Sequence, residues 1–480
     1  MIKESETLKM VTNDTNDSLR HIFRAYDIRG IFNREITPIN NFRIGLAFGT
    51  FLQREKGLKP ENDHIFVAYD VRQTSSLLGQ AFAAGLMTTG INIEYSAEPL
   101  QFGACMYSGV KGKAFATAFI TASHLPPEWN GVKFYYGSGV GFSEEDNMKI
   151  RDIFFSNDFI RPGWELVGQM TRKNLKNEYR EYLRSKISLK RQLKVVIDCG
   201  NGSSCLSAPE ILKSTGLEMI PLFCEVDPTF PNRSSEPNEE SLQSLSSKVI
   251  QENADFGVGF DGDGDRAVIV DNRGRILLAD ITGILLAKFM LPRFEGKNRI
   301  LANVECSLAL EKALPDSAIV DRIKVGHTFL TADAQTKKDT LLGVESSGHF
   351  VFPHIYLFDD AMIVPLIVAE MLSVNDEPLS ALVDQIPTLN KRKIAIPAPD
   401  NIKFNAIAEL LEETRIEYSD QVNDIDGIGI SFGTESWVLI RASNTGPKIR
   451  VIVEADSESR ADELLTLFQN KLEDKLKKFR

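Results

Sequence analysis

The hydrophobic residues of this chain are grouped in short runs that alternate with helix-like segments. Apolar runs at 64–70, 113–124 and 193–204 each end in charged, hydroxyl or glycine residues. The stretch 75–90 has helical character and stops at Gly90, which is typical of a helix end. Strands that alternate with helices predict parallel or mixed sheets of the α/β class. Ligands of such sheets bind beyond the carboxyl ends of the strands.

The last part of the chain has a different pattern. Residues 401–415 predict a helix, and three apolar runs at 426–432, 436–443 and 449–455 predict strands. A closing helix is expected from Ser457. Strands that follow one another through short turns favour a mostly antiparallel sheet, so this part is expected to be an α+β unit.

The length of 480 residues is more than one hydrophobic core usually organises, and it favours about three or four domains. The changes of pattern place boundaries near residues 165, 275 and 385. We therefore expect a mobile tail at 1–20, α/β domains at 21–165, 166–275 and 276–385, and a C-terminal α+β domain at 386–480.

Composition and charge exclude several classes of protein. The net charge of −11 argues against a generic nucleic-acid or anionic-membrane binder. The five cysteines show no C-x-x-C spacing, which argues against a disulfide framework or a zinc site. No apolar run approaches the ~20 residues that span a bilayer, and the polar N-terminus does not resemble a signal peptide. A cytoplasmic protein is expected, either a monomer or a small homo-oligomer.

The most specific local motif is a run of alternating carboxylates after an apolar strand. Asp261, Asp263 and Asp265 are separated by glycines and followed by Arg266. Three such carboxylates can converge on one hard cation. An EF-hand would need glycine where Arg266 stands and glutamate where Asn272 stands. Few oxygen ligands favour Mg²⁺ completed by a phosphate oxygen. The alternative, a solvated acidic turn, suffers from mutual repulsion of the carboxylates.

A second motif is the segment 121–124, Thr-Ala-Ser-His, directly after a buried strand pattern. Ser123 is expected in a turn, where its hydroxyl can be reached by a ligand. His124 and Lys133 supply groups for proton transfer or phosphate contact. The motif differs from the G-x-S-x-G nucleophile elbow of hydrolases, and a serine in a turn is uninformative by itself.

Four further segments have plausible but less specific chemistry. The hydroxyls, amide and arginines of 441–450 suit a dianionic phosphate, although an ordinary hairpin loop would look similar. The carboxylate and hydroxyls of 343–349 suit sugar hydroxyls, although a capped turn is an equal alternative. Basic residues at 24–30 and 324–327 could contact phosphate or form structural ion pairs.

Taken together and in this order, the motifs resemble the α-D-phosphohexomutase family, which includes phosphoglucomutases, phosphomannomutases and phosphoglucosamine mutases. The resemblance spans roughly residues 22–455. It implies four domains arranged around a central cleft: three α/β units with mixed sheets and the C-terminal α+β domain. It also implies a phosphosugar as substrate, Mg²⁺ as cofactor and a hexose 1,6-bisphosphate as activator.

The family's loops carry over residue by residue. The phosphoserine loop T-A-S-H-N-P-x-x-x-N-G-x-K is matched by Ser123, His124, Asn130, Gly131 and Lys133, with Leu125 in place of asparagine. The metal loop D-G-D-G-D-R is matched fully by residues 261–266.

The sugar loop G-G-E-x-S-G-H is matched by Gly343, Glu345, Ser347, Gly348 and His349, with Val344 in place of the second glycine. The phosphate loop R-x-S-N-T-E-P-x-x-R is matched by Arg441, Ser443, Asn444, Thr445, Pro447 and Arg450, with Gly446 in place of glutamate.

The resemblance also implies a role for each residue. Ser123 would carry the phosphoryl group, and its phosphate would contact the Mg²⁺ held by Asp261, Asp263 and Asp265. Arg29 and Arg266 would stabilise that group, and Glu345 and Ser347 would bind the sugar. The substrate's own phosphate would bind Arg441, Ser443, Asn444, Thr445 and Arg450. The expected groups for proton transfer or charge stabilisation are Lys133, His349 and His327.

Two other functions compete with the mutase. A phosphatase with an aspartate nucleophile could use the D-x-D-x-D run, with Asp359 and Asp360 as a second acidic pair, but the D-x-D-x-[TV] pattern is missing. A non-catalytic sugar-phosphate binding protein is left open by the three departures from the family's loops. Within the mutases, S-N-T in the phosphate loop argues against glucosamine phosphate. One hydroxyl contact contributes only ~1–3 kcal/mol, so mannose phosphate, glucose phosphate or both are the expected substrates.

Overall fold

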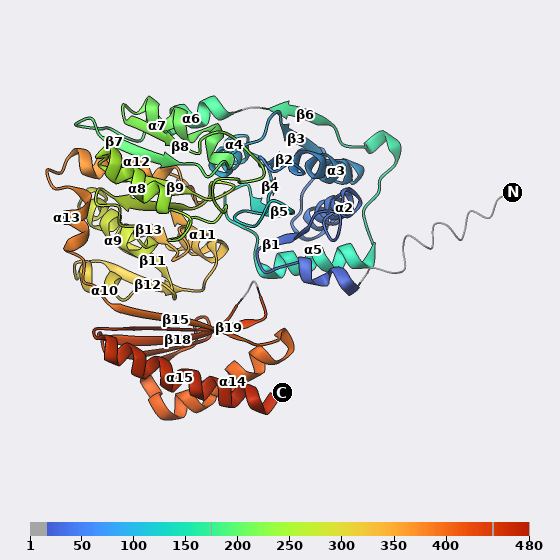
Figure 1. Ribbon diagram of the computed structural model, residues 1–480. Helices are drawn as coiled ribbons and strands as arrows, with labels where there is room; N and C mark the ends of the chain where they lie inside the picture. The colour runs from blue at the N-terminus through green and yellow to red at the C-terminus, as the bar shows by residue number, and fades with distance from the viewer. Residues whose placement is uncertain (1–16, 174, 444–445, 480) are drawn as a thin grey trace.

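The computed structural model describes residues 17–173, 175–443 and 446–479. Four separate sheets, each with its own helices, follow one another along the chain (Figure 1). The predicted four-domain architecture, three α/β units with mixed sheets and a C-terminal α+β domain, is therefore confirmed. The tail expected at 1–20 lies outside the described residues as far as residue 16. The remaining residues begin a short 3-10 helix, η1 (Asp17–Ile22).

The first sheet has six strands in the order β1-β5-β4-β2-β3-β6. They are β1 (Asp27–Ile31), β2 (His64–Tyr69), β3 (Asn92–Ser96), β4 (Ala116–Ile120), β5 (Trp129–Tyr136) and β6 (Met170–Lys173). Its helices are α2 (Pro38–Glu55), α3 (Ser75–Thr88), α4 (Phe102–Lys111), α5 (Glu144–Ser156) and η2 (Trp164–Leu166). Strand β5 runs antiparallel to both β4 and β1. This pairing places Lys133 opposite Phe119, near the end of β4 that leads to Ser123.

The second and third sheets have four strands each, in the orders β10-β9-β7-β8 and β12-β11-β13-β14. The strands are β7 (Lys194–Asp198), β8 (Glu218–Leu222), β9 (Phe256–Phe260), β10 (Ala267–Asp271), β11 (Arg299–Asn303), β12 (Ile319–Ile323), β13 (Thr340–Val344) and β14 (Phe350–Val351). In each sheet three strands are parallel and one edge strand, β10 or β14, is antiparallel. Both sheets are therefore mixed.

Short helices surround these two sheets. They are α6 (Lys176–Arg184), η3 (Ser203–Leu206), α7 (Ala208–Ser214), α8 (Gln243–Glu252), α9 (Ala279–Met290), η4 (Leu291–Arg293), α10 (Ala309–Ala313), α11 (His327–Thr336), α12 (Ile363–Ser373) and α13 (Leu379–Asp384). Helix α12 is buried over almost its whole length, which explains why its sequence is apolar on every side.

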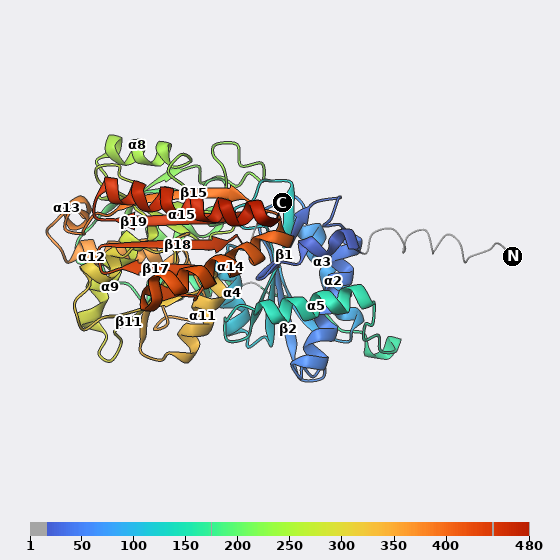
Figure 2. The same ribbon diagram turned by 90° about the horizontal axis from the view of Figure 1, so that it is seen from below.

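The fourth sheet is entirely antiparallel, in the order β15-β19-β18-β17-β16. Its strands are β15 (Asn390–Pro397), β16 (Val422–Asn423), β17 (Ile428–Phe432), β18 (Ser436–Ala442) and β19 (Lys448–Ala455). The helices α14 (Asp400–Tyr418) and α15 (Glu458–Phe479) cover the face that is turned away from the rest of the molecule, and η5 (Ser419–Gln421) follows α14 (Figures 1 and 2).

The packing divides the molecule into two unequal parts. One continuous buried cluster extends through the three α/β domains, from Phe66 to Ile386. The C-terminal domain has its own core between the fourth sheet and its helices. A small apolar cluster joins that domain to the third one through Val304, Trp437 and Leu439. In the described part of the chain, no helix has the length and apolar character that crossing a membrane requires.

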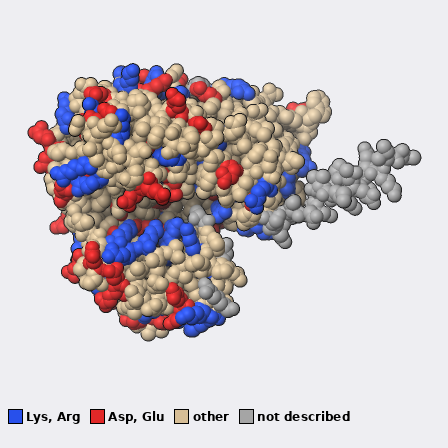
Figure 3. All heavy atoms as spheres, in the orientation of Figure 1, with Lys and Arg blue, Asp and Glu red and all other residues tan. Residues whose placement is uncertain are grey.

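A hollow separates the C-terminal domain from the α/β domains. Figure 3 shows that lysines and arginines gather on the C-terminal domain's side of this hollow, whereas acidic residues lie on part of the opposite side. Because the carboxyl ends of several strands also open toward the space between the domains, the hollow is where a ligand is expected.

Candidate active site

The acidic loop after β9 folds around one of its own carboxylates. Oδ1 of Asp261 accepts hydrogen bonds from the backbone N–H groups of Gly264, Asp265 and Arg266, at 3.0, 3.0 and 3.1 Å. Gly264 has φ +81°, a conformation that glycine adopts without strain. This tight path places Asp261, Asp263 and Asp265 with carboxylate oxygens within 4.8 Å of one another, and all three are fully buried.

This carboxylate cluster fits a divalent cation. Oδ1 of Asp263 and Oδ1 of Asp265 are buried and have no hydrogen-bond partner, which is costly unless another group binds there. Burial and the other two carboxylates raise the pKa of Asp261 well above its usual value. A cation at this cluster would satisfy the unpaired oxygens and relieve that repulsion, and three oxygen ligands with open positions suit Mg²⁺.

Lys133 reaches the same cluster from β5. Its Nζ donates to Oδ2 of Asp263 at 3.0 Å and to Oδ2 of Asp265 at 2.5 Å. Burial lowers the pKa of Lys133, but the two carboxylates outweigh it and raise the pKa above its ordinary value. Lys133 is therefore a fixed cation at the edge of the cluster.

Ser123 lies just beyond β4 with its side chain turned toward the acidic loop. Its φ is +53°, which is uncommon for a residue with a side chain. Its Oγ donates to Oδ2 of Asp261 at 3.3 Å. Nη2 of Arg72 donates to the Ser123 carbonyl at 2.8 Å, and Thr121 accepts from its backbone N–H at 2.9 Å. A Cβ on Gly262 would come within 2.5 Å of the same carbonyl, so this close approach requires glycine.

Arg29 and His124 flank Ser123. Arg29, on β1, forms an ion pair with Asp27 and is mostly buried. Nδ1 of His124 lies 3.4 Å from Oγ of Ser123. Burial, with the charges of Arg266 and Arg29, lowers the pKa of His124, so this imidazole is neutral near pH 7. Arg29 thus adds positive charge beside Ser123, whereas His124 adds none.

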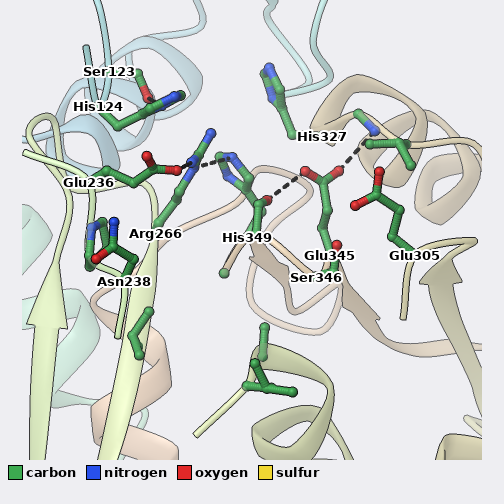
Figure 4. Close-up of a pocket in the computed structure, with 18 of the residues that line it drawn as sticks. Ser123, His124, Glu236, Asn238, Arg266, Glu305, His327, Glu345, Ser346 and His349 are labelled. Atoms are coloured by element: carbon green, nitrogen blue, oxygen red, sulfur yellow. Dashed lines mark hydrogen bonds and ion pairs between the residues drawn. The ribbon is translucent and has the colours of Figure 1, made fainter. Parts of the chain in front are cut away.

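A chain of contacts connects the acidic loop with two histidines. Nε of Arg266 donates to Nε2 of His349 at 3.0 Å (Figure 4). Nδ1 of His349 lies 2.6 Å from Oδ2 of Asp359. Burial lowers the pKa of His349, but the carboxylates of Asp265 and Asp359 raise it to a net value above the usual one. His327 stacks on His349, with ring centroids 5.4 Å apart.

The predicted sugar loop is tied to the segment that carries His327. Oε1 of Glu345 accepts from the hydroxyl of Ser347 at 2.6 Å, and Oε2 accepts from the backbone N–H of Gly326 at 2.9 Å. Gly348 has φ +100°, which allows the loop to turn back toward β14. Glu345 and Ser347 both line the space between the domains.

The predicted phosphate loop lies in the C-terminal domain. Arg441 on β18 and Arg450 on β19 are directly paired in the sheet. Ser443 follows β18, and its backbone N–H donates to the Lys448 carbonyl at 2.9 Å. The predictions for Asn444 and Thr445 lie outside the described residues.

One cavity of about 460 Å³ collects side chains from all four domains. Figure 4 shows Arg266 and His349 between Ser123 on one side and Glu345 and Glu305 on the other. The predicted residues that line it are Arg29, Ser123, His124, Lys133, Arg266, His327, Glu345, Ser347, Gly348, His349, Arg441, Ser443 and Arg450. The three aspartates lie behind Ser123 and Lys133, outside the lining itself.

Several residues at this site were not predicted from the sequence. Glu305 lines the cavity and contacts both Arg441 and Arg450. Lys393 lines it as well, from β15. Glu305 stands just past the carboxyl end of β11, so the rule that located the other motifs would also have pointed to it. Nothing in the sequence distinguishes Lys393 from other lysines of an exposed strand.

The two adjacent aspartates considered for a phosphatase do not form a pair. Asp359 contacts His349, whereas Asp360 accepts hydrogen bonds from the hydroxyls of Tyr179 and Tyr356, both at 2.7 Å. Their side chains contact different residues. The second acidic pair that the phosphatase alternative requires is therefore not formed.

Comparison with known families finds four matches in chain order, all described as phosphoglucomutase/phosphomannomutase. Alpha/beta/alpha domains I, II and III match residues 20–161, 177–274 and 279–389, and the C-terminal domain matches residues 394–470.

Similar proteins match over nearly their whole length. A phosphoglucomutase/phosphomannomutase of Thermococcus kodakarensis is 34% identical over 464 residues, covering 95% of this chain and 99% of the relative. A probable phosphoglucosamine mutase of Methanothermobacter thermautotrophicus is 31% identical, covering 92% and 95%. The crystal structure of a phosphoglucomutase/phosphomannomutase family protein from Burkholderia thailandensis superposes with a TM-score of 0.84 at 26% identity, covering 95% and 97%.

Proposed function

The chain belongs to the phosphoglucomutase/phosphomannomutase family, and from this premise we propose that it interconverts hexose 1-phosphate and hexose 6-phosphate through a phosphoserine at Ser123. We propose glucose and mannose as the sugars and a hexose 1,6-bisphosphate as the intermediate. The observation that carries the proposal is the position of Ser123: its Oγ lies 3.3 Å from Asp261, at the edge of a cavity lined with cations from other domains.

The first half-reaction transfers the phosphoryl group from Ser123 to the sugar. The P–O bond to Oγ of Ser123 breaks and Oγ takes up a proton, while a P–O bond to the free sugar hydroxyl forms and that hydroxyl loses its proton. Lys133, Arg29 and Arg266 place positive charge beside the group in transfer. The residues of the acidic loop, Asp261, Asp263 and Asp265, would hold a Mg²⁺, which when bound offsets negative charge on the phosphoryl oxygens.

The proton of the sugar hydroxyl is assigned to His349. Its imidazole is oriented by Asp359, and its Nε2 faces Arg266 and the cavity. Lys133 is less suited to proton transfer because two carboxylates hold its ammonium group. His327, stacked on His349, supports that ring.

The second half-reaction returns the other phosphate of the bisphosphate to Ser123. The bisphosphate turns over, so that the phosphate once held by the C-terminal domain lies at Oγ of Ser123. The P–O bond to the sugar oxygen breaks, a new P–O bond to Oγ forms as Oγ loses its proton, and the sugar oxygen takes up a proton. Glu345 and Ser347 are suited to hold the sugar hydroxyls in both orientations because their side chains face the cavity between the two phosphate sites.

A coupled assay tests the proposal. Purified protein with Mg²⁺ and glucose 1,6-bisphosphate would be given glucose 1-phosphate, mannose 1-phosphate or glucosamine 1-phosphate, and kcat/KM compared. We expect turnover of the first two and a lower kcat/KM for the third. Isomerisation of none of the three would contradict the mutase and favour a sugar-phosphate binding protein. Release of inorganic phosphate without isomerisation would favour a phosphatase.

A further inference from the structure

Glu305 occupies an unusual place among the cations of the C-terminal domain. It follows β11 of the third domain and lines the cavity. Oε1 of Glu305 accepts from Nη1 of Arg441 at 2.9 Å and from Nη1 of Arg450 at 3.1 Å. Oε2 accepts from Nζ of Lys393 at 3.3 Å. One carboxylate from the third domain thus pairs with three cations of the fourth.

These ion pairs are shielded from water to different degrees. The side chains of Glu305 and Arg441 are 6% and 2% exposed, whereas those of Arg450 and Lys393 are 25% and 50% exposed. Burial raises the pKa of Glu305, but Lys393, Arg441 and Arg450 together lower it to about 2. The three cations therefore favour the ionised carboxylate of Glu305.

A second carboxylate, that of Asp426, also lies beside Arg441. Asp426 forms an ion pair with Nη2 of Arg441 at 3.1 Å and also accepts from the backbone N–H of Val325. Arg450 and Lys393 are the more accessible cations, and both face the cavity. A phosphate that enters the cavity would meet these two cations. The side-chain nitrogens that would bind it already contact the carboxylate of Glu305.

We propose that Glu305 is an internal competitor for the phosphate group of the substrate, which weakens phosphate binding at the C-terminal domain and speeds its release. The inference rests on the proposed function, since the group in question is the phosphate of a hexose phosphate. A dianion and a carboxylate that share the same cations repel each other strongly because little water screens them. The phosphate must therefore displace the carboxylate or bind against its charge.

Weak binding suits a reaction in which the intermediate must turn over. Each of its two phosphates occupies the C-terminal site in one half-reaction and leaves it before the other. Binding that stabilises the bound state without stabilising a transition state slows such a step. A competing carboxylate keeps Lys393, Arg441 and Arg450 oriented between turnovers and limits how firmly they hold the phosphate.

The test is the affinity of the unphosphorylated protein for inorganic phosphate, measured by calorimetry without any sugar. Glu305→Gln keeps the size and the acceptor oxygen but removes the charge. We expect it to bind phosphate about tenfold or more tightly than the wild type. Glu295→Gln, which removes an equal charge from an exposed position of the same domain, is the matched control and is expected to bind as the wild type does.

Two further variants keep the inference testable. Glu305→Ala, which removes charge and acceptor together, is also expected to tighten phosphate binding and covers the case in which the glutamine variant fails to fold. Adding Arg450→Gln to Glu305→Gln is expected to abolish the gain, which locates it at the C-terminal domain. Unchanged or weaker phosphate binding in both single variants would overturn the inference, because it would mean that Glu305 only holds the arginines in place.

The outcomes also separate this inference from the proposed function. Tighter phosphate binding by Glu305→Gln without any isomerisation by the wild type would support the competitor and contradict the mutase. If the wild type is a mutase, Glu305→Gln is expected to lower both KM and kcat. A lower KM with unchanged kcat would contradict the role assigned to Glu305 in release.

Discussion

At the scale of single residues, the conformation of Ser123 links local strain to chemistry. A positive φ at a residue with a side chain costs about 1–3 kcal/mol and persists only where the surroundings enforce it. Arg72 holds the Ser123 carbonyl, Thr121 holds its N–H, and Gly262 leaves space for the carbonyl. These contacts turn Oγ toward Asp261 instead of away from the acidic loop. They position a hydroxyl for which the local sequence alone predicts only a turn.

Replacing Ser123 by alanine tests its assigned role. We expect turnover to fall about a thousandfold or more, because the proposed mechanism passes the phosphoryl group through Oγ of Ser123. The thermal unfolding midpoint should change little, since within the described residues Oγ makes a long contact with Asp261 and one with His124. Protein labelled from a radioactive hexose bisphosphate should carry phosphate in the wild type and none in Ser123→Ala.

The matched control is Ser156→Ala, which removes a hydroxyl from the exposed end of α5. It should keep wild-type turnover and labelling. Near-normal turnover by Ser123→Ala would rule out the phosphoserine mechanism.

At the scale of elements, the β9–β10 hairpin is built to hold charge. The apolar residues of both strands are buried except for the half-buried Val268, and the pairing of Phe256–Phe260 with Ala267–Asp271 fixes the ends of the acidic loop. The loop then satisfies three of its own backbone N–H groups with Asp261. The other two carboxylates keep one unpaired oxygen each. A rigid hairpin with unpaired buried oxygens is a favourable scaffold for a cation.

Removal of metal and of one carboxylate tests this scaffold. We expect EDTA to abolish turnover and Mg²⁺ to restore it. Asp263→Asn should raise the dissociation constant for Mg²⁺ about tenfold or more, because an amide replaces a charged ligand. Calorimetry measures this constant without turnover.

Asp255→Asn is the control at the opposite end of β9, where the carboxylate accepts from the Lys194 N–H. Its affinity for Mg²⁺ should equal that of the wild type. Full activity of the wild type in metal-free buffer would remove the role given to the aspartates.

At the scale of the whole molecule, the site exists only because four domains meet. The three α/β domains share one continuous core, so Ser123, Asp261 and His349 are held together by extensive packing. The C-terminal domain has a separate core and reaches the site through a small apolar cluster and the ion pairs of Glu305. The domain that binds the substrate's phosphate in our proposal is therefore the one that is least firmly packed against the others.

Asp360 is buried where elements of the α/β domains meet. Its carboxylate makes the free energy of unfolding depend on pH. Its carboxylate accepts from Tyr179 of α6 and from Tyr356, and a Cβ on Gly103 of α4 would contact it. Burial raises the pKa of Asp360 from 3.8 to about 6, although these hydrogen bonds oppose the shift. The folded protein therefore holds this proton more tightly than the unfolded chain does, and stability is lost as pH rises from about 4 to about 6.

The substitution Asp360→Asn tests this dependence. It removes the titrating group and keeps the shape of the side chain. The free energy of unfolding of the wild type should fall by about 3 kcal/mol over this pH range for a pKa shift of this size, and that of the variant should not. The measurement is the unfolding midpoint of both proteins at pH 4.5 and pH 7.5. The variant should gain stability relative to the wild type at the higher pH. Asp316→Asn, at an exposed position, is the control, and an equal pH response of Asp360→Asn and the wild type would contradict the assignment.

The sequence by itself determined several of the strands, such as β2, β4 and β7, and the polar side chains that follow them. Apolar runs followed by glycines and polar side chains located Ser123, the acidic loop and the phosphate loop, because these features depend on residues close together in the chain. The same local reasoning separated the antiparallel C-terminal unit from the α/β units, since short turns between strands are visible in the sequence.

Only the tertiary structure decided how distant residues divide the work. Asp359 and Asp360 are neighbours in the chain, yet one contacts His349 and the other contacts Tyr179, because each faces a different neighbouring element. Glu305 became a partner of Arg441 and Arg450 only when the third and fourth domains packed together. Such pairings depend on the positions of whole domains, and no local pattern of hydrophobic and polar residues encodes the distance between them.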